Sequence, residues 1–274
     1  MIVYERAGSR MSREERASEV IRPRFWQRIE NKYREAQSYL RHRRPQAMKN
    51  QKPIVSFTFD DVPKSACTRG RQILEGHGIR ASYYLAMSLM DQVYSIGAAF
   101  SRSDLEHLLE GGHEIGSHTY DHLDAWSTEA GLFEASIHEN QRKLSELHPG
   151  EVFRTLSYPI NIPRPQIKMR AGALHVCCRG GGQAFNSGTA DLNLLKSYFV
   201  DARNRGHLDA IKKIIDESCE KTGWLIFSTH DIEAHPSPYG CPPELLEDLV
   251  RYAERSGSDL LPVYDAWALL DGAP

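Results

Sequence analysis

Short, largely apolar segments alternate along the chain with longer segments in which apolar residues recur every three or four positions. The first kind is typical of buried strands, and the second is typical of amphipathic helices. We expect strands at Ile54–Phe59, Ala81–Leu85, Glu114–Ser117, Thr155–Tyr158, Leu174–Cys178, Ser197–Asp201, Trp224–Thr229 and Leu260–Leu261. We expect helices at Thr68–His77, Ser103–Leu109, Thr128–Leu147, Leu208–Cys219, Pro243–Arg255 and Tyr264–Leu270. A capping box formed by Ser103 and Glu106 is expected to open the second of these helices.

This alternation predicts the α/β class, with a parallel sheet and helices outside it. About seven to eight strand–helix units are enough for an irregular (β/α) barrel, so we expect the sheet to close on itself. The barrel is expected within residues 51–274, which we interpret as the catalytic domain.

Residues 1–50 are interpreted as a basic helical N-terminal extension. Residues 12–42 have the pattern of one charged, weakly amphipathic helix, which Pro23 is expected to end or kink. The first 50 residues hold 13 Lys/Arg and 6 Asp/Glu, a net charge of +7, in a chain whose net charge is -2. The extension is either a solvated helix or a segment that docks on the acidic body, on a partner subunit or on an anionic surface. Self-association through residues 12–42 is one such possibility.

Composition narrows the class of protein further. A net charge of -2 predicts no nucleic-acid partner for the chain as a whole. The five cysteines have no regular spacing and predict no disulfide framework. No apolar run has the length of a signal peptide or of a transmembrane segment. We therefore expect a cytoplasmic location.

Titratable side chains follow the carboxyl ends of several predicted strands, where barrel enzymes place their chemistry. Asp60 and Asp61 follow the first strand, His118 follows the third, and His122 lies one helical turn after His118. One carboxylate and two imidazoles make a three-ligand site with room for a water, the usual form of a catalytic zinc site. The other carboxylate is left to act as a base. His230 follows the strand at Trp224–Thr229 and is a candidate proton donor.

Each of these signals is weak when it stands alone. Adjacent aspartates after a strand are common in helix caps and turns, and pairs of histidines arise by chance. Their combination at strand ends favours a metal-assisted hydrolase.

Three motifs resemble the polysaccharide deacetylase family (carbohydrate esterase family four, the NodB-homology domain). They are Thr58-Phe59-Asp60-Asp61, Gly112–His122 and Leu225–Asp231, in the order and spacing of that family. The resemblance implies an irregular (β/α) barrel with a divalent metal, most often zinc. It implies that Asp61, His118 and His122 are the metal ligands, Asp60 the general base and His230 the general acid.

The family's third motif is altered in this chain. Tyr158 and Pro159 match it, but Ile160 replaces an aromatic residue and Asn161 replaces a glycine. The resemblance implies that the backbone N–H of Ile160 stabilises the oxyanion, a role that a changed side chain leaves intact. The family's arginine, which tunes the base, would fall at Ser157, so that role is vacant or filled elsewhere.

Further site residues are expected around this centre. Asp201 is the candidate that orients His230, with Asp191 as the alternative, and Tyr158, Tyr239 and Trp126 are candidate substrate-binding residues. The glycine-rich run Cys177–Gly182 lacks the ending of a phosphate-binding loop, so we interpret it as a strand followed by a flexible active-site loop.

The resemblance implies hydrolysis of N-acetyl groups on a poly- or oligosaccharide, with release of acetate. Two alternatives stay open: a deacetylase or deformylase that acts on a lipid- or nucleotide-linked sugar or a non-sugar amide, and a catalytically degenerate sugar-binding protein. Two histidines and a carboxylate suit zinc, cobalt, nickel or manganese, so the ligands leave the choice among these metals open.

Overall fold

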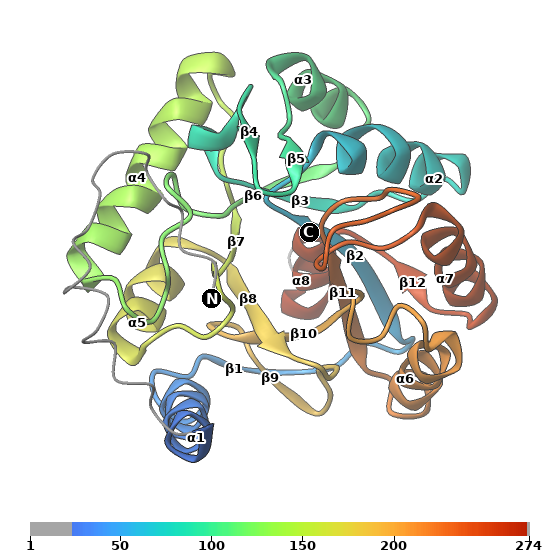
Figure 1. Cartoon of the computed structure of the whole chain (residues 1–274). Coiled ribbons are helices and arrows are strands. Elements are labelled where there is room, and N and C mark those ends of the chain that lie inside the picture. The colour runs from blue at the N-terminus through green and yellow to red at the C-terminus, as the bar shows by residue number, and fades with distance from the viewer. Residues whose placement is uncertain (1–23, 273–274) are drawn as a thin grey trace.

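Seven parallel strands close into a barrel in the computed structural model of the protein, which describes residues 24–272 (Figure 1). In spatial order they are β2 (Ile54–Asp60), β3 (Ser82–Leu85), β6 (Glu114–Ser117), β7 (Thr155–Ser157), β8 (Cys177–Gly182), β10 (Leu195–Phe199) and β11 (Trp224–Thr229). The barrel closes where β11 pairs with β2 along six residues. A short eighth strand, β12 (Asp259–Leu260), pairs with the first two residues of β2, ahead of the stretch that pairs with β3.

Helices surround the barrel. They are α2 (Arg71–Gly76), α3 (Arg102–Glu110), α4 (Ala130–Leu147), α5 (Pro165–Leu174), α6 (Leu208–Glu220), α7 (Pro243–Arg255) and α8 (Val263–Asp271). A π-helical turn, η2 (Ala66–Gly70), leads into α2, and a 3-10 turn, η3 (Met87–Leu89), follows β3. A two-stranded hairpin, β4 (Val93–Tyr94) and β5 (Gly97–Ala98), lies in front of the barrel in Figure 1.

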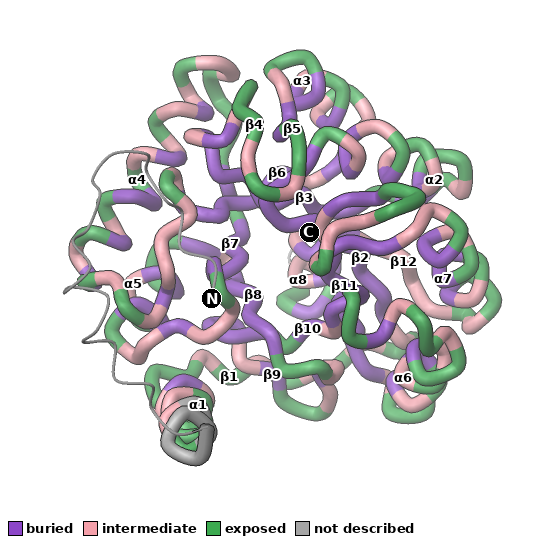
Figure 2. The backbone as a smooth tube through the Cα atoms, viewed as in Figure 1, coloured by how far each residue is buried: buried purple, intermediate pink, exposed green. Residues whose placement is uncertain are grey.

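The strands form the core because both of their faces are covered. All seven residues of β2 and all six of β11 are buried, which is typical of parallel sheets enclosed by helices. Figure 2 shows buried backbone along the barrel strands and exposed backbone on the outer helices. At one end of the barrel, Val263, Ala266 and Leu270 of α8 join a buried cluster with Ile54 and Trp224.

The extension is joined to the body by several contacts. Its helix α1 (Arg24–Leu40) lies beside α5 in Figure 1, and the buried Nζ of Lys168 donates a hydrogen bond to the carbonyl of Ser38 (2.7 Å). The strand β1 (Pro45–Ala47) pairs antiparallel with β9 (Thr189–Asp191). Pro23 and residues 12–22 of the expected helix lie outside the described residues.

The predicted barrel is confirmed, and most predicted strands agree with the observed ones to within one or two residues. Three local predictions were wrong. The run Leu174–Cys178 is not one strand, because α5 ends at Leu174 and β8 begins at Cys177. The glycine-rich residues after Cys178 continue β8 instead of forming a loop. The capping box of α3 is formed by Ser101 and Asp104, so that helix begins earlier than predicted.

Candidate active site

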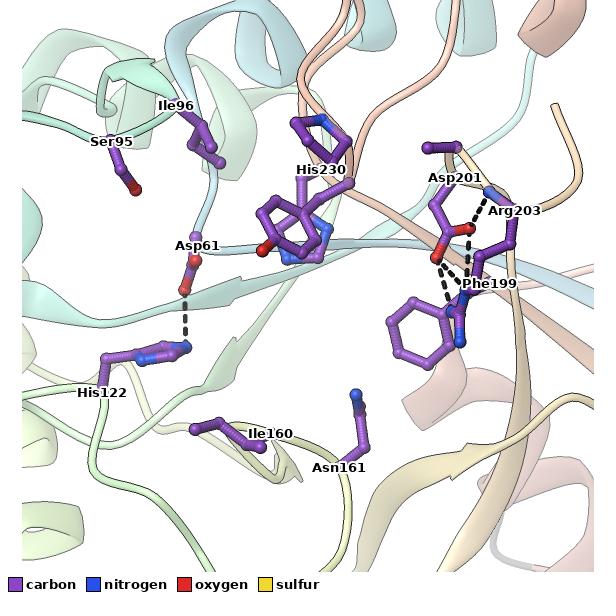
Figure 3. A pocket seen from close by; sticks show the side chains of 13 residues that line it. Asp61, Ser95, Ile96, His122, Ile160, Asn161, Phe199, Asp201, Arg203 and His230 are labelled. Carbon is purple, nitrogen blue, oxygen red and sulfur yellow. Dashed lines mark hydrogen bonds and ion pairs between the residues drawn. The ribbon is translucent and has the colours of Figure 1, made fainter. Parts of the chain in front are cut away.

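Three predicted metal ligands meet at the carboxyl ends of β2 and β6. Asp61 directly follows β2, and His118 and His122 follow β6. The Nε2 atoms of His118 and His122 lie 3.5 and 3.2 Å from Oδ1 of Asp61 (Figure 3 shows the Asp61–His122 contact). The three side chains therefore converge on one point.

The donor set fits a divalent metal. Two ligands about 2.05 Å from a tetrahedral zinc ion lie roughly 3.3 Å apart, close to the separations found here. Oδ1 of Asp61 is buried and, beyond its close approach to the two imidazoles, has no hydrogen-bond partner among the described residues, which a metal would supply. Nδ1 of His118 lies 2.8 Å from the carbonyl oxygen of Ser157, a contact that fixes the proton on Nδ1 and leaves Nε2 free to bind a metal.

The backbone around these ligands is strained. Asp61 (φ 57°) and His122 (φ 51°) are left-handed, as are the β-branched residues Val62, Thr119 and Ile160. Each left-handed non-glycine residue costs roughly 1–2 kcal/mol. Because strain of this kind is concentrated at functional sites, the backbone conformation supports the same location for the active site as the titratable side chains do.

Asp60, the expected general base, is buried beside the ligand cluster. It forms an ion pair with Nη2 of Arg179, and its Oδ2 accepts a hydrogen bond from Oγ of Ser228 (3.0 Å). Burial alone would raise the pKa of Asp60, but the guanidinium of Arg179, through its charge and its hydrogen bond, outweighs burial and holds the pKa below its usual range. Asp60 is therefore a carboxylate at neutral pH.

Sequence analysis missed Arg179, the partner of this carboxylate. Its side chain is fully buried, and the guanidinium lies over the rings of Tyr84 and Phe199 at 5.1 and 5.7 Å. One local signal was available: an arginine at a buried strand position needs an anionic partner. The identity of the partner was out of reach, because Asp60 lies 119 residues earlier in the chain.

His230 lies at the end of β11 and faces the same cavity as Asp61 and His122. The centre of its ring lies 5.5 Å from that of Tyr239, and its Nδ1 is buried without a hydrogen-bond partner within residues 24–272. The carboxylate of Asp201 lines the cavity but accepts its side-chain bonds from Arg203, and no bond among the described residues joins it to His230. The alternative, Asp191, is bound by Lys168 beside α1 (2.6 Å). An orienting partner for His230 is thus absent from the described contacts.

The cavity in Figure 3 has a volume of about 450 Å³. Besides the ligands and His230, its walls include Ile160, Asn161, Phe199 and Tyr239. Ile160 (φ 61°) and Asn161 (φ 70°) are both left-handed and follow β7. The cavity is large enough for a sugar ring, and its walls combine apolar surface with the titratable cluster.

Two predicted substrate-binding residues lie elsewhere. Tyr158 is fully buried, and its hydroxyl donates to the carbonyl of Asn193 (3.0 Å), so its side chain cannot contact a saccharide in the cavity. Trp126 lines a separate groove beside α1. Closeness in sequence to a site residue thus does not fix where a side chain points. Tyr239 lies in the cavity wall, as expected.

Comparisons with known proteins point to one family. Residues 47–167 match the family described as polysaccharide deacetylase. A chitin deacetylase from Pestalotiopsis sp is 26% identical over 92 residues, which are 34% of this chain and 29% of that protein. The match thus spans less than a third of the length of this curated relative.

Solved structures share the fold. A family 4 acetyl xylan esterase from Clostridium thermocellum, in complex with a cobalt ion, has a TM-score of 0.57 at 17% identity, covering 81% of this chain and 93% of that one. A CE4 family pseudoenzyme from Bacillus anthracis has a TM-score of 0.53 at 12% identity, covering 79% of this chain and 66% of that one. Because a pseudoenzyme shares the fold, the fold alone does not establish activity.

Proposed function

We propose that this chain, which belongs to the polysaccharide deacetylase family, hydrolyses N-acetyl groups on amino sugars of a poly- or oligosaccharide and releases acetate. One observation carries the proposal: Asp61 and His122 of the ligand cluster and the imidazole of His230 line one cavity of sugar size, and the carboxylate of Asp60 is buried next to Asp61. We further propose that residues 51–274 are the catalytic domain and that zinc is the metal.

Asp61, His118 and His122 would hold the metal, which when bound polarises the amide carbonyl and acidifies water. Asp60, which is ionised and accepts a hydrogen bond at each oxygen, would take a proton from the attacking water. The backbone N–H of Ile160, a residue of the cavity wall, would donate a hydrogen bond to the developing oxyanion. His230 donates a proton to the departing amine, so that the C–N bond breaks to give acetate and a free amino sugar.

The first experiment measures bound metal by elemental mass spectrometry, on protein stripped with chelator and reloaded with zinc. Acetate release from N-acetylglucosamine oligomers is then measured on the same samples. We expect about one zinc per chain and turnover in the wild type. His118→Ala should lose both the zinc and turnover, whereas Asp60→Asn should keep the zinc and lose turnover.

Other results would redirect the proposal. An active Asp60→Asn protein would refute the assignment of the base. Acetate release from acetylated xylan alone would make the chain an esterase. Zinc binding with no release from any acetylated saccharide would favour a sugar-binding protein that keeps only the fold.

A second groove favours a saccharide that carries negative charge. Its volume is about 430 Å³, and it lies between α1 and the segments that follow His122 and Ile160. The rings of Tyr33 and Trp126 and the side chains of Arg41 and Arg164 line it, and the described lining residues include no Asp or Glu. Nε of Arg164 is buried without a hydrogen-bond partner among the described residues. Aromatic rings pack against sugar faces, and guanidinium groups bind carboxylates.

The effect of this groove on KM can be tested with two oligosaccharides of equal length. One is neutral and contains only N-acetylglucosamine; the other alternates N-acetylglucosamine with glucuronic acid. Replacing Arg41 and Arg164 by Ala should raise KM for the acidic oligomer about tenfold and leave the neutral one unchanged. Arg102→Ala, on α3 across the barrel from α1, is the control (Figure 1). Equal changes for both oligomers would contradict recognition of charge in the groove.

A further inference from the structure

We infer that Arg179 of β8 is the positioning residue that holds the Asp60 carboxylate in place as the general base, an inference that rests on the proposed function. Arg179 is not among the described residues that line the cavity. Its effect on the reaction would pass through Asp60.

The contacts of Arg179 connect three strands. Nη2 donates to the Asp60 carboxylate of β2 and to Oγ of Ser157 on β7 (2.5 Å). Nη1 donates to Oγ of Ser197 on β10 (3.3 Å). Because Ser228 of β11 binds the second oxygen of Asp60, the carboxylate is fixed from two sides of the barrel. A planar guanidinium held at this many points has one orientation, which it imposes on its partner.

Aromatic contacts restrict the guanidinium as well. Its Cζ lies 5.1 Å from the ring of Tyr84 and 5.7 Å from the ring of Phe199, and Arg179 has no exposed surface. Gly180, the next residue, has no room for a side chain, because a Cβ there would lie 2.6 Å from the carbonyl oxygen of Asn161. The strand that carries Arg179 is thus packed directly against the loop of Ile160.

Stability alone explains this arrangement poorly. Nε of Arg179 is buried and has no hydrogen-bond partner in the described part of the chain, so one donor of the guanidinium is left unsatisfied there. A buried ion pair generally stabilises a fold no better than well-packed apolar side chains of similar size. A buried guanidinium that lies beside a candidate base and leaves one of its donors unpaired is better explained by a role in positioning that base than by stability.

Ser157 offers a sharp test of the role. Ser157 and Arg179 are direct cross-strand partners in the register of β7 and β8, and residues paired in this way point to the same face of a parallel sheet. Both side chains are fully buried, and both reach the same point beside Asp60. An arginine at 157 would therefore approach Asp60 from the neighbouring strand, and a serine at 179 would leave room for it.

The test compares Arg179→Met, Arg179→Lys and the exchange Ser157→Arg/Arg179→Ser with the wild type. Acetate release from N-acetylglucosamine oligomers is normalised to zinc-loaded, folded protein. We expect Arg179→Met to lower kcat at least about 100-fold with KM within about threefold. Arg179→Lys keeps the charge but lacks the planar fork, so it should recover only part of the rate. The exchange should recover at least about tenfold relative to Arg179→Met.

Two results would overturn the inference. One is a kcat for Arg179→Met within about threefold of the wild type. The other is a fall in acetate release that disappears when the rate is divided by the amount of zinc-loaded, folded protein. That result would mean that Arg179 only supports the fold or the metal site. Should Arg179→Met fail to fold, the single variant Arg179→Ser is measured as the reference instead. An exchange variant that folds but has no higher kcat than Arg179→Ser would then contradict the inference.

A second readout is independent of turnover and separates this inference from the proposed function. In protein labelled with ¹⁵N-arginine, the Nη–H signals of Arg179 are assigned by their loss in Arg179→Lys. They should be protected from exchange with water in the wild type and should shift in Asp60→Asn. Signals that exchange freely with water and do not shift in Asp60→Asn would refute the contact between Arg179 and Asp60. If the signals are protected but the protein releases no acetate, the proposed function is contradicted, whereas the ion pair between Arg179 and Asp60 is supported.

Discussion

Left-handed backbone at single residues marks the site as clearly as its side chains do. Asp61 and His122, which are predicted metal ligands, and Ile160, the expected oxyanion donor, all have positive φ. An isoleucine is unfavourable in this conformation because its branched side chain crowds the following carbonyl. Since Ile160 is half exposed, burial of its side chain does not offset that cost. We therefore expect the backbone geometry of Ile160, rather than its side chain, to be needed for function.

Replacing Ile160 by Gly tests whether the backbone or the side chain is used. Glycine adopts positive φ without strain, so relief of about 1–2 kcal/mol should exceed the entropic cost of about 0.5–1 kcal/mol. We expect a slight gain in the free energy of unfolding and a kcat within about threefold of the wild type. Ile160→Ala is the matched control, because it keeps a Cβ and the strain. A large loss of kcat in Ile160→Gly alone would show that the rigid backbone or the side chain is needed.

Sequence reasoning at the level of elements succeeded where the local pattern is strong. The strands β2 and β11 are uninterrupted buried runs, and β6 ends directly before His118, so Asp60, Asp61, His118 and His230 could be placed at one end of the barrel. It failed at β8, because Gly180, Gly181 and Gly182 are poor strand formers and no local rule anticipates a strand required for packing. Helix α5 was missed because its apolar residues have little helical periodicity, although Pro165 is a good first residue. Arg179 was overlooked for the same reason as β8.

The glycine strand yields a prediction at the same scale. A Cβ on Gly180 would lie 2.5 Å from Cδ1 of Leu194 and 2.6 Å from the carbonyl oxygen of Asn161, so the loop of Ile160 must move. We expect Gly180→Ala to reduce the free energy of unfolding by about 1–3 kcal/mol and to lower kcat more than it lowers zinc binding. Gly206→Ala is the control, because a Cβ there meets no atom within 4 Å. Equal behaviour of the two variants in denaturation and in turnover would contradict close packing at Gly180.

At the scale of the whole molecule, the closed barrel follows from alternation of strands and helices, but attachment of the extension does not. Asn193 and Arg44 join segments far apart in sequence: Asn193 donates to the carbonyl of His42 (2.9 Å), and Arg44 donates to the carbonyl of Gly172 (2.8 Å). Such contacts depend on the assembled surface of the barrel. No helix within residues 24–272 is long and apolar enough to cross a membrane. The expected self-association through residues 12–42 stays a prediction.

Burial of His175 beneath this attachment predicts how stability depends on pH. Burial, more than any other influence, lowers the pKa of His175 to about 4, while its Nδ1 bonds to the carbonyl of Ala171 (2.9 Å). The unfolded chain, with a pKa of about 6.5, binds the proton first, so the contribution of neutral His175 is complete above that pH and is lost as pH falls toward 4.

His175→Gln should remove this dependence. Between pH 7.5 and pH 5 the wild type should lose about 2 kcal/mol more than the variant in the free energy of unfolding, since each pKa unit corresponds to about 1.36 kcal/mol. Denaturant titrations of chelator-treated protein at the two pH values measure this difference, because protonation of the other histidines then affects both proteins alike. Equal losses in the two proteins would mean that His175 is hydrated or charged in the folded state, and that the junction between the extension and the barrel is more open than these contacts indicate.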